Sequence, residues 1–204
     1  MTRVFLIRHG ETEWNKNMKY QGQTDVPLSD AGRKQAEKLA SRLSKVDFAA
    51  VYSSDLIRAY ETATVLAAPH ELPVTVCPGL KEINFGEWEG LTYDNISGQW
   101  SGEMQRLFSR PNEVEIPSGE SFYQVQQRVV ASLEELVKAH ENETILVVSH
   151  GAAIRTAICA ALEIPLNNLW SIRQDNTALN IFEYHAERIV IGCLNDSNHL
   201  AEKK

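Results

Sequence analysis

Two short apolar segments, far apart in the chain, each lead into a histidine that is followed by a glycine. A single residue separates Val4–Ile7 from His9, and a single residue separates Ile145–Val148 from His150. Runs of this kind are typical of strands that are buried on both faces. Ligands of open α/β sheets bind in the crevice outside the carboxyl ends of such strands. We therefore expect the two histidines to meet at one edge of a sheet.

Strand and helix patterns alternate along the rest of the chain. Strands are expected over Ala49–Tyr52, Pro73–Cys77, Ala178–Tyr184 and Arg188–Cys193, and helices from Ser29, from Ser54 or Asp55 to about Ala67, from Ser121 to about His140, and over Ala152–Leu162. This alternation predicts an α/β fold of three α/β/α layers around a mainly parallel sheet, with a closing antiparallel hairpin. The segment from about 80 to 120 is expected to be an irregular or partly helical insertion over the site, because loops that long are seldom idle.

Length and charge exclude several classes of function. A chain of 204 residues predicts one domain spanning 1–204. The net charge of −7 argues against nucleic acid as a partner, and an anionic substrate would need positive charge gathered in its pocket. No stretch approaches the ~20 apolar residues of a membrane span and no signal peptide is recognisable, so we expect a cytoplasmic protein without a membrane partner. The three cysteines fit neither a disulfide framework nor a zinc motif.

His9 is the first candidate for catalysis. A neutral, well-oriented imidazole can attack the phosphorus of a phosphate ester and form a covalent intermediate that divides one difficult step into two. A single histidine at a strand end would more often be structural. The adjacent Arg8, which can donate two hydrogen bonds to phosphate oxygens, and the second histidine at His150 favour a phosphoryl-transfer site.

Arg58 follows the second expected strand, in the first turns of a helix. An arginine on a helix is usually solvated, but helix-start amides and a guanidinium at a strand end both favour an anion. Together Arg8, Arg58 and His150 would surround the charge of a transferring phosphoryl group.

The reaction also needs an acid that protonates the leaving oxygen. Glu82 begins the long insertion and is our candidate, since a side chain there can reach the mouth of the pocket. Glu87 and Glu89 are interpreted as solvated surface residues, and Glu11, on the tight turn beside His9, as structural.

The segment Arg8–Thr12, which reads Arg-His-Gly-Glu-Thr, is followed in order by Arg58, Glu82 and Ser149–Gly151, which reads Ser-His-Gly. This pattern resembles the histidine phosphatase superfamily, also called phosphoglycerate-mutase-like, over essentially the whole chain.

The resemblance implies that His9 is the phosphorylated nucleophile. It places Arg8, Arg58 and His150 in the phosphate pocket, and it makes Glu82 the proton donor and later the base that activates water. Further phosphate-binding and substrate-binding positions implied by the family pattern are Asn15, Gln21, Gly22 and Gly151. Asp175–Thr177 is expected at the pocket rim. No metal or other cofactor is expected, because arginines would repel the zinc ion that two histidines and a glutamate suggest.

Three functions remain open on the sequence. The first is a phosphatase of small phosphorylated metabolites. The second is a cofactor-dependent phosphoglycerate mutase, but mutases of this family resemble longer chains with a more basic insertion, and Arg106 and Arg110 are not the adjacent pair expected for the glycerate carboxylate. The third is a non-catalytic phospho-ligand binder, which would need neither a nucleophile nor an acid.

Several stretches resemble α-ribazole phosphatases of cobalamin biosynthesis and related broad-specificity phosphatases, namely 20–29, 85–90 and 117–121. The resemblance makes α-ribazole 5'-phosphate a candidate substrate. Four aromatic residues of the insertion are expected either to stack on an aromatic substrate or to pack on the core, namely Trp88, Tyr93, Trp100 and Phe108. The sequence leaves open whether the protein is a monomer or a homodimer.

Overall fold

A computed structural model describes residues 1–201 of the chain. The strands are β1 (Thr2–Arg8), β2 (Ala50–Ser53), β3 (Val74–Val76), β4 (Thr144–Ser149), β5 (Leu179–Tyr184) and β6 (Ile189–Asp196). They form one sheet in the order β3-β2-β4-β1-β5-β6. The first four strands are parallel to one another, and β5 pairs antiparallel with both β1 and β6. The predicted parallel sheet with its closing hairpin is therefore confirmed.

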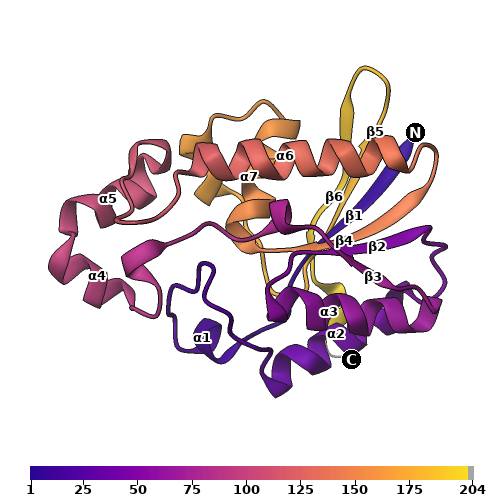
Figure 1. Cartoon of the computed structure of the whole chain (residues 1–204), viewed down its shortest axis with the longest axis horizontal. Helices are drawn as coiled ribbons and strands as arrows, with labels where there is room; N and C mark the ends of the chain where they lie inside the picture. Colours follow the sequence, from indigo (N-terminus) through magenta and orange to yellow (C-terminus); the bar gives the residue numbers. More distant parts are fainter. Residues whose placement is uncertain (202–204) are drawn as a thin grey trace.

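Helices cover both faces of this sheet (Figure 1). The helices are α1 (Glu13–Lys16), α2 (Asp30–Leu43), α3 (Ile57–Ala67), α4 (Tyr93–Gln99), α5 (Ser101–Ser109), α6 (Phe122–Ala139) and α7 (Gly151–Ala161). Side chains of β1 alternate between two cores: Val4 and Leu6 face the core of α6 and α7, whereas Phe5 and Ile7 face the core of α2 and α3. Each strand of the centre is thus apolar on both faces, which accounts for its continuous apolar run.

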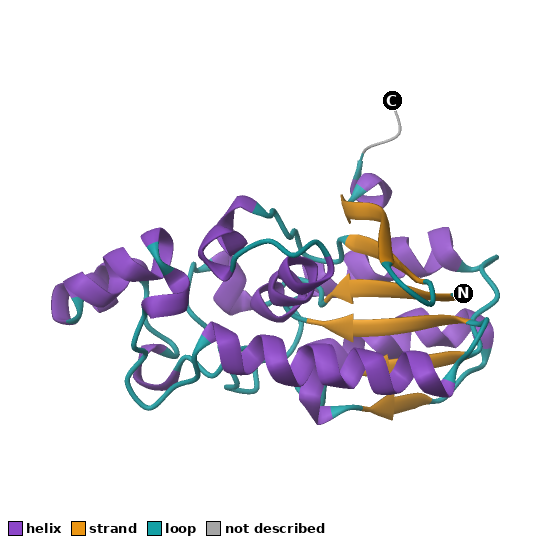
Figure 2. Ribbon diagram, turned by 90° about the horizontal axis from the view of Figure 1, so that it is seen from above, coloured by secondary structure: helices purple, strands orange, loops and turns teal. Residues whose placement is uncertain are grey.

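The insertion between β3 and α6 extends the molecule to one side (Figures 1 and 2). It carries α4 and α5, and its apolar side chains join the core beneath α6 and α7. Trp88 is 0% exposed in that core. A capping box between Ser121 and Gln124 then starts α6, as the sequence predicts.

The predicted cap of α3 is wrong. Neither Ser54 nor Asp55 caps this helix; it begins at Ile57, whose backbone N–H donates to Asp25 Oδ1 at 2.7 Å. Ser54 instead contacts His150, and Asp55 pairs with Lys81 at 2.9 Å. The partners of Ser54 and Asp55, and the acceptor at the start of α3, are all distant in sequence, and local patterns do not reveal such partners.

No helix within residues 1–201 is long and apolar enough to cross a membrane.

Candidate active site

The two histidines lie side by side at the carboxyl end of the central strands. β1 and β4 pair in parallel with Arg8 opposite Ser149, so that His9 and His150 both follow at the next position. The backbone N–H of His9 donates to Ser149 O at 3.0 Å, and the centroids of the two imidazole rings are 5.1 Å apart.

The His9 ring is held with one nitrogen free. His9 Nδ1 lies 2.7 Å from Gly10 O, and since a carbonyl oxygen only accepts, Nδ1 carries the proton. Burial, together with the charges of Arg58 and Arg8, lowers the pKa of His9 well below its usual value. The imidazole is therefore neutral at pH 7, and Nε2 keeps the lone pair that a nucleophile requires.

His150 is fully buried beside His9 and is held by Ser54. His150 Nε2 lies 2.8 Å from Ser54 Oγ, which itself accepts the N–H of Leu56 at 3.2 Å. The Ser54 hydroxyl proton is thus available to Nε2, which leaves Nδ1–H as a buried donor without a partner among residues 1–201. Burial and the charges of Arg58, His9 and Arg8 lower the pKa of His150 well below its usual value.

Arg8 and Arg58 are fixed by backbone carbonyls. Arg8 donates to Gln174 O at 2.6 Å, and Arg58 donates to Thr24 O at 3.0 Å and to Gly22 O at 2.6 Å. In each guanidinium Nε is buried and lacks a partner among the described residues. Burial lowers the pKa of Arg58 to about 10, so both side chains remain cations at neutral pH and offer unused donors to an anion.

Glu89 orders the loop that fixes Arg58. The Glu89 carboxylate accepts the N–H groups of Gln23 and Thr24, each at 2.7 Å, and that of Phe85 at 3.1 Å. A Cβ on Gly22, which has a φ of 55°, would lie 1.9 Å from Glu89 Oε1. The interpretation of Glu89 as a solvated surface residue is therefore wrong, whereas Glu87 is exposed as expected.

Glu82 lies at the amino end of α7. Its carboxylate accepts the N–H groups of Ala152, Ala153 and Ile83 at 3.0 to 3.1 Å. These donors fix the orientation of the carboxylate at the start of α7.

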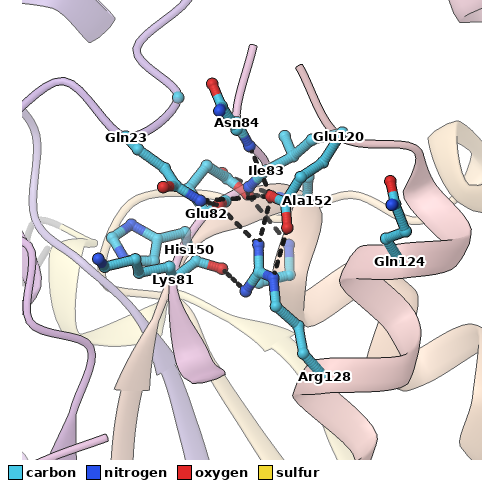
Figure 3. Close-up of polar contacts among 12 residues, drawn as sticks. Gln23, Lys81, Glu82, Ile83, Asn84, Glu120, Gln124, Arg128, His150 and Ala152 are labelled. Carbon is cyan, nitrogen blue, oxygen red and sulfur yellow. Dashed lines mark hydrogen bonds and ion pairs between the residues drawn. The ribbon is translucent and has the colours of Figure 1, made fainter. Parts of the chain in front are cut away.

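Arg128 and Glu120 hold the backbone of Glu82 in place (Figure 3). Arg128 donates to Glu82 O at 2.8 Å and to Lys81 O at 2.6 Å, and it makes a two-pronged pair with Glu120 at 2.9 Å. Glu120 also accepts the N–H of Asn84 at 2.8 Å. Although burial acts to raise it, the pKa of Glu120 is lowered by the hydrogen bonds from Arg128 and Asn84. We call Arg128 and Glu120 the Glu82 clamp.

A cavity of about 350 Å³ opens at this edge of the sheet. Of the residues that the sequence singles out, it is lined by Arg8, His9, Asn15, Gln21, Gly22, Arg58, Glu82 and Gly151. His150 is not among the lining residues, but its ring lies beside that of His9, which does line the cavity. Asn15 Oδ1 accepts the backbone N–H of Thr12 at 3.2 Å and Gln21 Oε1 accepts the Thr12 hydroxyl at 2.9 Å, and this fixes their side chains along the wall.

Other expectations for the pocket wall are met only in part. Tyr93 and Phe108 line the cavity, whereas Trp88 and Trp100 pack on the core, the other role expected for the aromatic residues of the insertion. Asp175–Thr177 is not among the lining residues, but it supports two of them: Asn176 Nδ2 donates to His9 O at 3.1 Å and to Asn15 Oδ1 at 3.2 Å.

Seven lining residues are not candidate site residues of the sequence analysis, namely Met18, Lys19, Tyr20, Phe85, Ala152, Arg155 and Trp170. A signal existed for one of them, because Arg155 is the only charged residue in the otherwise apolar and small-residue helix α7.

The model of the histidine phosphatase superfamily (branch 1) matches residues 4–197, and the chain belongs to this family. It is 38% identical over 202 residues to phosphoserine phosphatase 1 of Hydrogenobacter thermophilus, covering 99% of this chain and 96% of that protein. Among solved structures it is similar to Bacillus stearothermophilus YhfR, with a TM-score of 0.95 and 35% identity over 98% of this chain and 100% of that one.

The α-ribazole phosphatase of Shigella flexneri is also similar, with a TM-score of 0.87 and 29% identity over 96% of each chain. The resemblance to this group is therefore confirmed, and the sequence identity to a phosphoserine phosphatase is higher, at 38%.

Within residues 1–201, no group of three or more histidine, cysteine, aspartate and glutamate side chains is arranged to hold a metal ion.

Proposed function

We propose that this protein is a metal-independent phosphatase that hydrolyses small phosphomonoesters through a phosphohistidine on His9. One observation carries the proposal: a neutral imidazole with a free Nε2 lies beside buried, unused guanidinium donors of Arg8 and Arg58. A bare nucleophile among cations suits a phosphate ester, whose dianion otherwise repels nucleophiles. The relatives named as phosphatases support the same activity.

In the first step, the phosphate lies between Arg8, Arg58 and His150. His9 Nε2 forms a bond to phosphorus as the bond from phosphorus to the leaving oxygen breaks, and Glu82 gives that oxygen its proton. The guanidinium groups and His150 Nδ1–H bear the charge of the equatorial oxygens.

In the second step, Glu82 takes a proton from water as the water oxygen attacks phosphorus and the bond to His9 Nε2 breaks. Phosphate and neutral His9 result, and Glu82 is again protonated. The hydrogen bonds from the start of α7 hold the Glu82 carboxylate in place for this step.

The insertion favours hydrolysis over the mutase reaction. Arg106 forms an ion pair with Glu103, and Arg110 lies 3.4 Å from Glu113; both arginines are exposed and neither lines the cavity. They therefore do not supply the paired cations that would retain a phosphoglycerate for return of the phosphoryl group.

The proposal is tested by phosphate release in EDTA from p-nitrophenyl phosphate, phosphoserine, 3-phosphoglycerate and α-ribazole 5'-phosphate. Relatives are named as phosphatases of phosphoserine and of α-ribazole phosphate, and 3-phosphoglycerate is the substrate of the mutase alternative. We expect release from p-nitrophenyl phosphate and at least one metabolite, with no effect of EDTA. Conversion of 3- to 2-phosphoglycerate without phosphate release would instead identify a mutase, and binding without either reaction would identify a binder.

The Glu82 clamp provides a second prediction. Arg128→Lys keeps the charge but loses the fork that holds Glu82 O and Glu120, and misplacement of a catalytic group by 1 Å can cost ~10²-fold in rate. We expect kcat for glycerol phosphate, a poor leaving group, to fall by that order, with a smaller loss for p-nitrophenyl phosphate and a similar KM. Arg110→Lys, in an exposed ion pair, is the matched control. A lower melting temperature with unchanged kcat would show that the clamp serves only stability.

A further inference from the structure

Arg155 is a cation of the cavity wall that the proposed chemistry does not use. It projects from α7, the helix whose first turn binds the Glu82 carboxylate. Its Nε donates to Ile172 O at 2.7 Å, and its guanidinium lies over the ring of Trp170, 5.2 Å from the centroid. The side chain is therefore anchored at Nε and along one face, while no partner within residues 1–201 accepts from its two terminal nitrogens.

The lack of a carboxylate partner sets Arg155 apart from most arginines of the chain. Seven arginines form ion pairs, namely Arg3, Arg33, Arg42, Arg106, Arg110, Arg128 and Arg173. Across the described part of the chain four do not, and Arg188 is one of these and is exposed. The other three are Arg8, Arg58 and Arg155, and all three line the cavity. Burial and the charge of Arg8 lower the pKa of Arg155 to about 10. Arg155 is therefore a cation whose charge is partly desolvated, and binding of an anion would stabilise it.

The charges in the cavity exceed what one phosphate needs. When Glu82 is protonated to act as an acid, Arg8, Arg58, Arg155 and Lys19 face a phosphate dianion, while His9 and His150 are neutral. A ligand that carries one more negative group would balance this excess better than a simple phosphate ester.

The free group on Arg155 lies close to the phosphate site. Its Nη1 is 3.1 Å, and Arg8 Nε 3.4 Å, from the point that a Cβ on Gly151 would occupy. A negative group only a few bonds from the ester oxygen can therefore reach Arg155 while the phosphate contacts Arg8. The two terminal nitrogens of a guanidinium present parallel donors whose spacing matches the two oxygens of a carboxylate.

We propose that Arg155 binds a carboxylate on the leaving group and thereby makes short phosphorylated hydroxy acids the preferred substrates. This inference rests on the proposed phosphatase function and adds to it a specificity-determining residue. Trp170 acts as the platform that keeps the guanidinium facing the cavity.

The test compares 3-phosphoglycerate with glycerol 3-phosphate, which has a hydroxymethyl group in place of the carboxylate. For the unmodified protein we expect a kcat/KM that is ~10- to 100-fold higher for 3-phosphoglycerate, the range for a charge-assisted hydrogen bond. Arg155→Met keeps an apolar stem against Trp170 and should abolish this preference, mainly through KM, while kcat/KM for glycerol 3-phosphate changes by less than ~3-fold. Arg155→Lys, which keeps the charge without the fork, should retain part of the preference.

Three results would overturn the inference. Equal losses on both substrates would mean that Arg155 binds the transferred phosphate or supports the fold. No loss on either would mean that it binds nothing in the cavity. The inference would also fail if the unmodified protein hydrolysed p-nitrophenyl phosphate but showed no preference for 3-phosphoglycerate over glycerol 3-phosphate.

Binding separates this inference from the proposed function. In the His9→Ala background, where hydrolysis is not expected, calorimetry should show that 3-phosphoglycerate binds ~10- to 100-fold more tightly than glycerol 3-phosphate, and that Arg155→Met removes the difference. If the unmodified protein hydrolyses no ester but this difference is present, the proposed function fails and the carboxylate site stands. If the difference is absent, the carboxylate site fails whatever the enzyme hydrolyses.

Discussion

Replacement of His9 by alanine should lower kcat by at least ~10⁴-fold for every phosphomonoester that the protein hydrolyses, because the covalent route has no other nucleophile. The side chain makes one hydrogen bond, from Nδ1 to Gly10 O, and packs against His150. The imidazole lies among the cations Arg8 and Arg58 and makes no ion pair with any of residues 1–201, so its removal should leave the fold intact. Steady-state kinetics and a thermal melt of the same preparation would check both statements.

Two controls sharpen this experiment. His185→Ala, in the exposed turn between β5 and β6, should leave kcat unchanged. Rapid mixing of the unmodified protein with substrate, followed by an alkaline quench and mass spectrometry, should place a phosphoryl group on the peptide that contains His9. Retention of more than about 1% of the activity by His9→Ala would contradict a loss of this order. A phosphoryl group on another residue would contradict the role of His9 as the nucleophile.

The approach of His9 to His150 could be predicted because it depends on rules that act over short stretches. Each histidine follows an apolar run that is buried on both faces, and parallel neighbours in a sheet end at the same edge. The register of β1 against β4 places the two side by side. Arg58 can be predicted on similar grounds, since it lies in the first turn of a helix that follows a strand, and Glu82 is a candidate because it lies at the start of the insertion.

The residues that hold this site were harder to predict, because their partners lie far away in sequence. Ser54 looks like a helix cap, yet the chain places Asp25 at that helix start and frees Ser54 for His150. Glu89 looks like a surface residue, yet it binds a loop that is more than sixty positions earlier. Local patterns report the state of a segment but not the tertiary partner that its polar groups find.

The acid role of Glu82 has the second largest expected effect. Loss of a general acid or base costs ~10²- to 10⁴-fold, and Glu82→Gln removes the transferable proton while it preserves shape. With glycerol 3-phosphate, whose alkoxide leaves poorly, phosphorylation of His9 itself should become slow. With p-nitrophenyl phosphate the leaving group hardly needs a proton, so phosphorylation should stay fast and only the attack of water should be slow.

Stopped-flow measurements distinguish these two consequences. Glu82→Gln mixed with p-nitrophenyl phosphate should release a burst of p-nitrophenol close to one equivalent per enzyme, followed by slow turnover, and the phosphohistidine should accumulate. Glu87→Gln, at an exposed neighbouring position, is the matched control and should behave as the unmodified protein does. A burst shows that Glu82 is dispensable when the leaving group is good and is needed to activate water. Equal losses for both substrates without a burst would mean that Glu82 only shapes the pocket, and the acid would then have to be sought among the other groups that line the cavity.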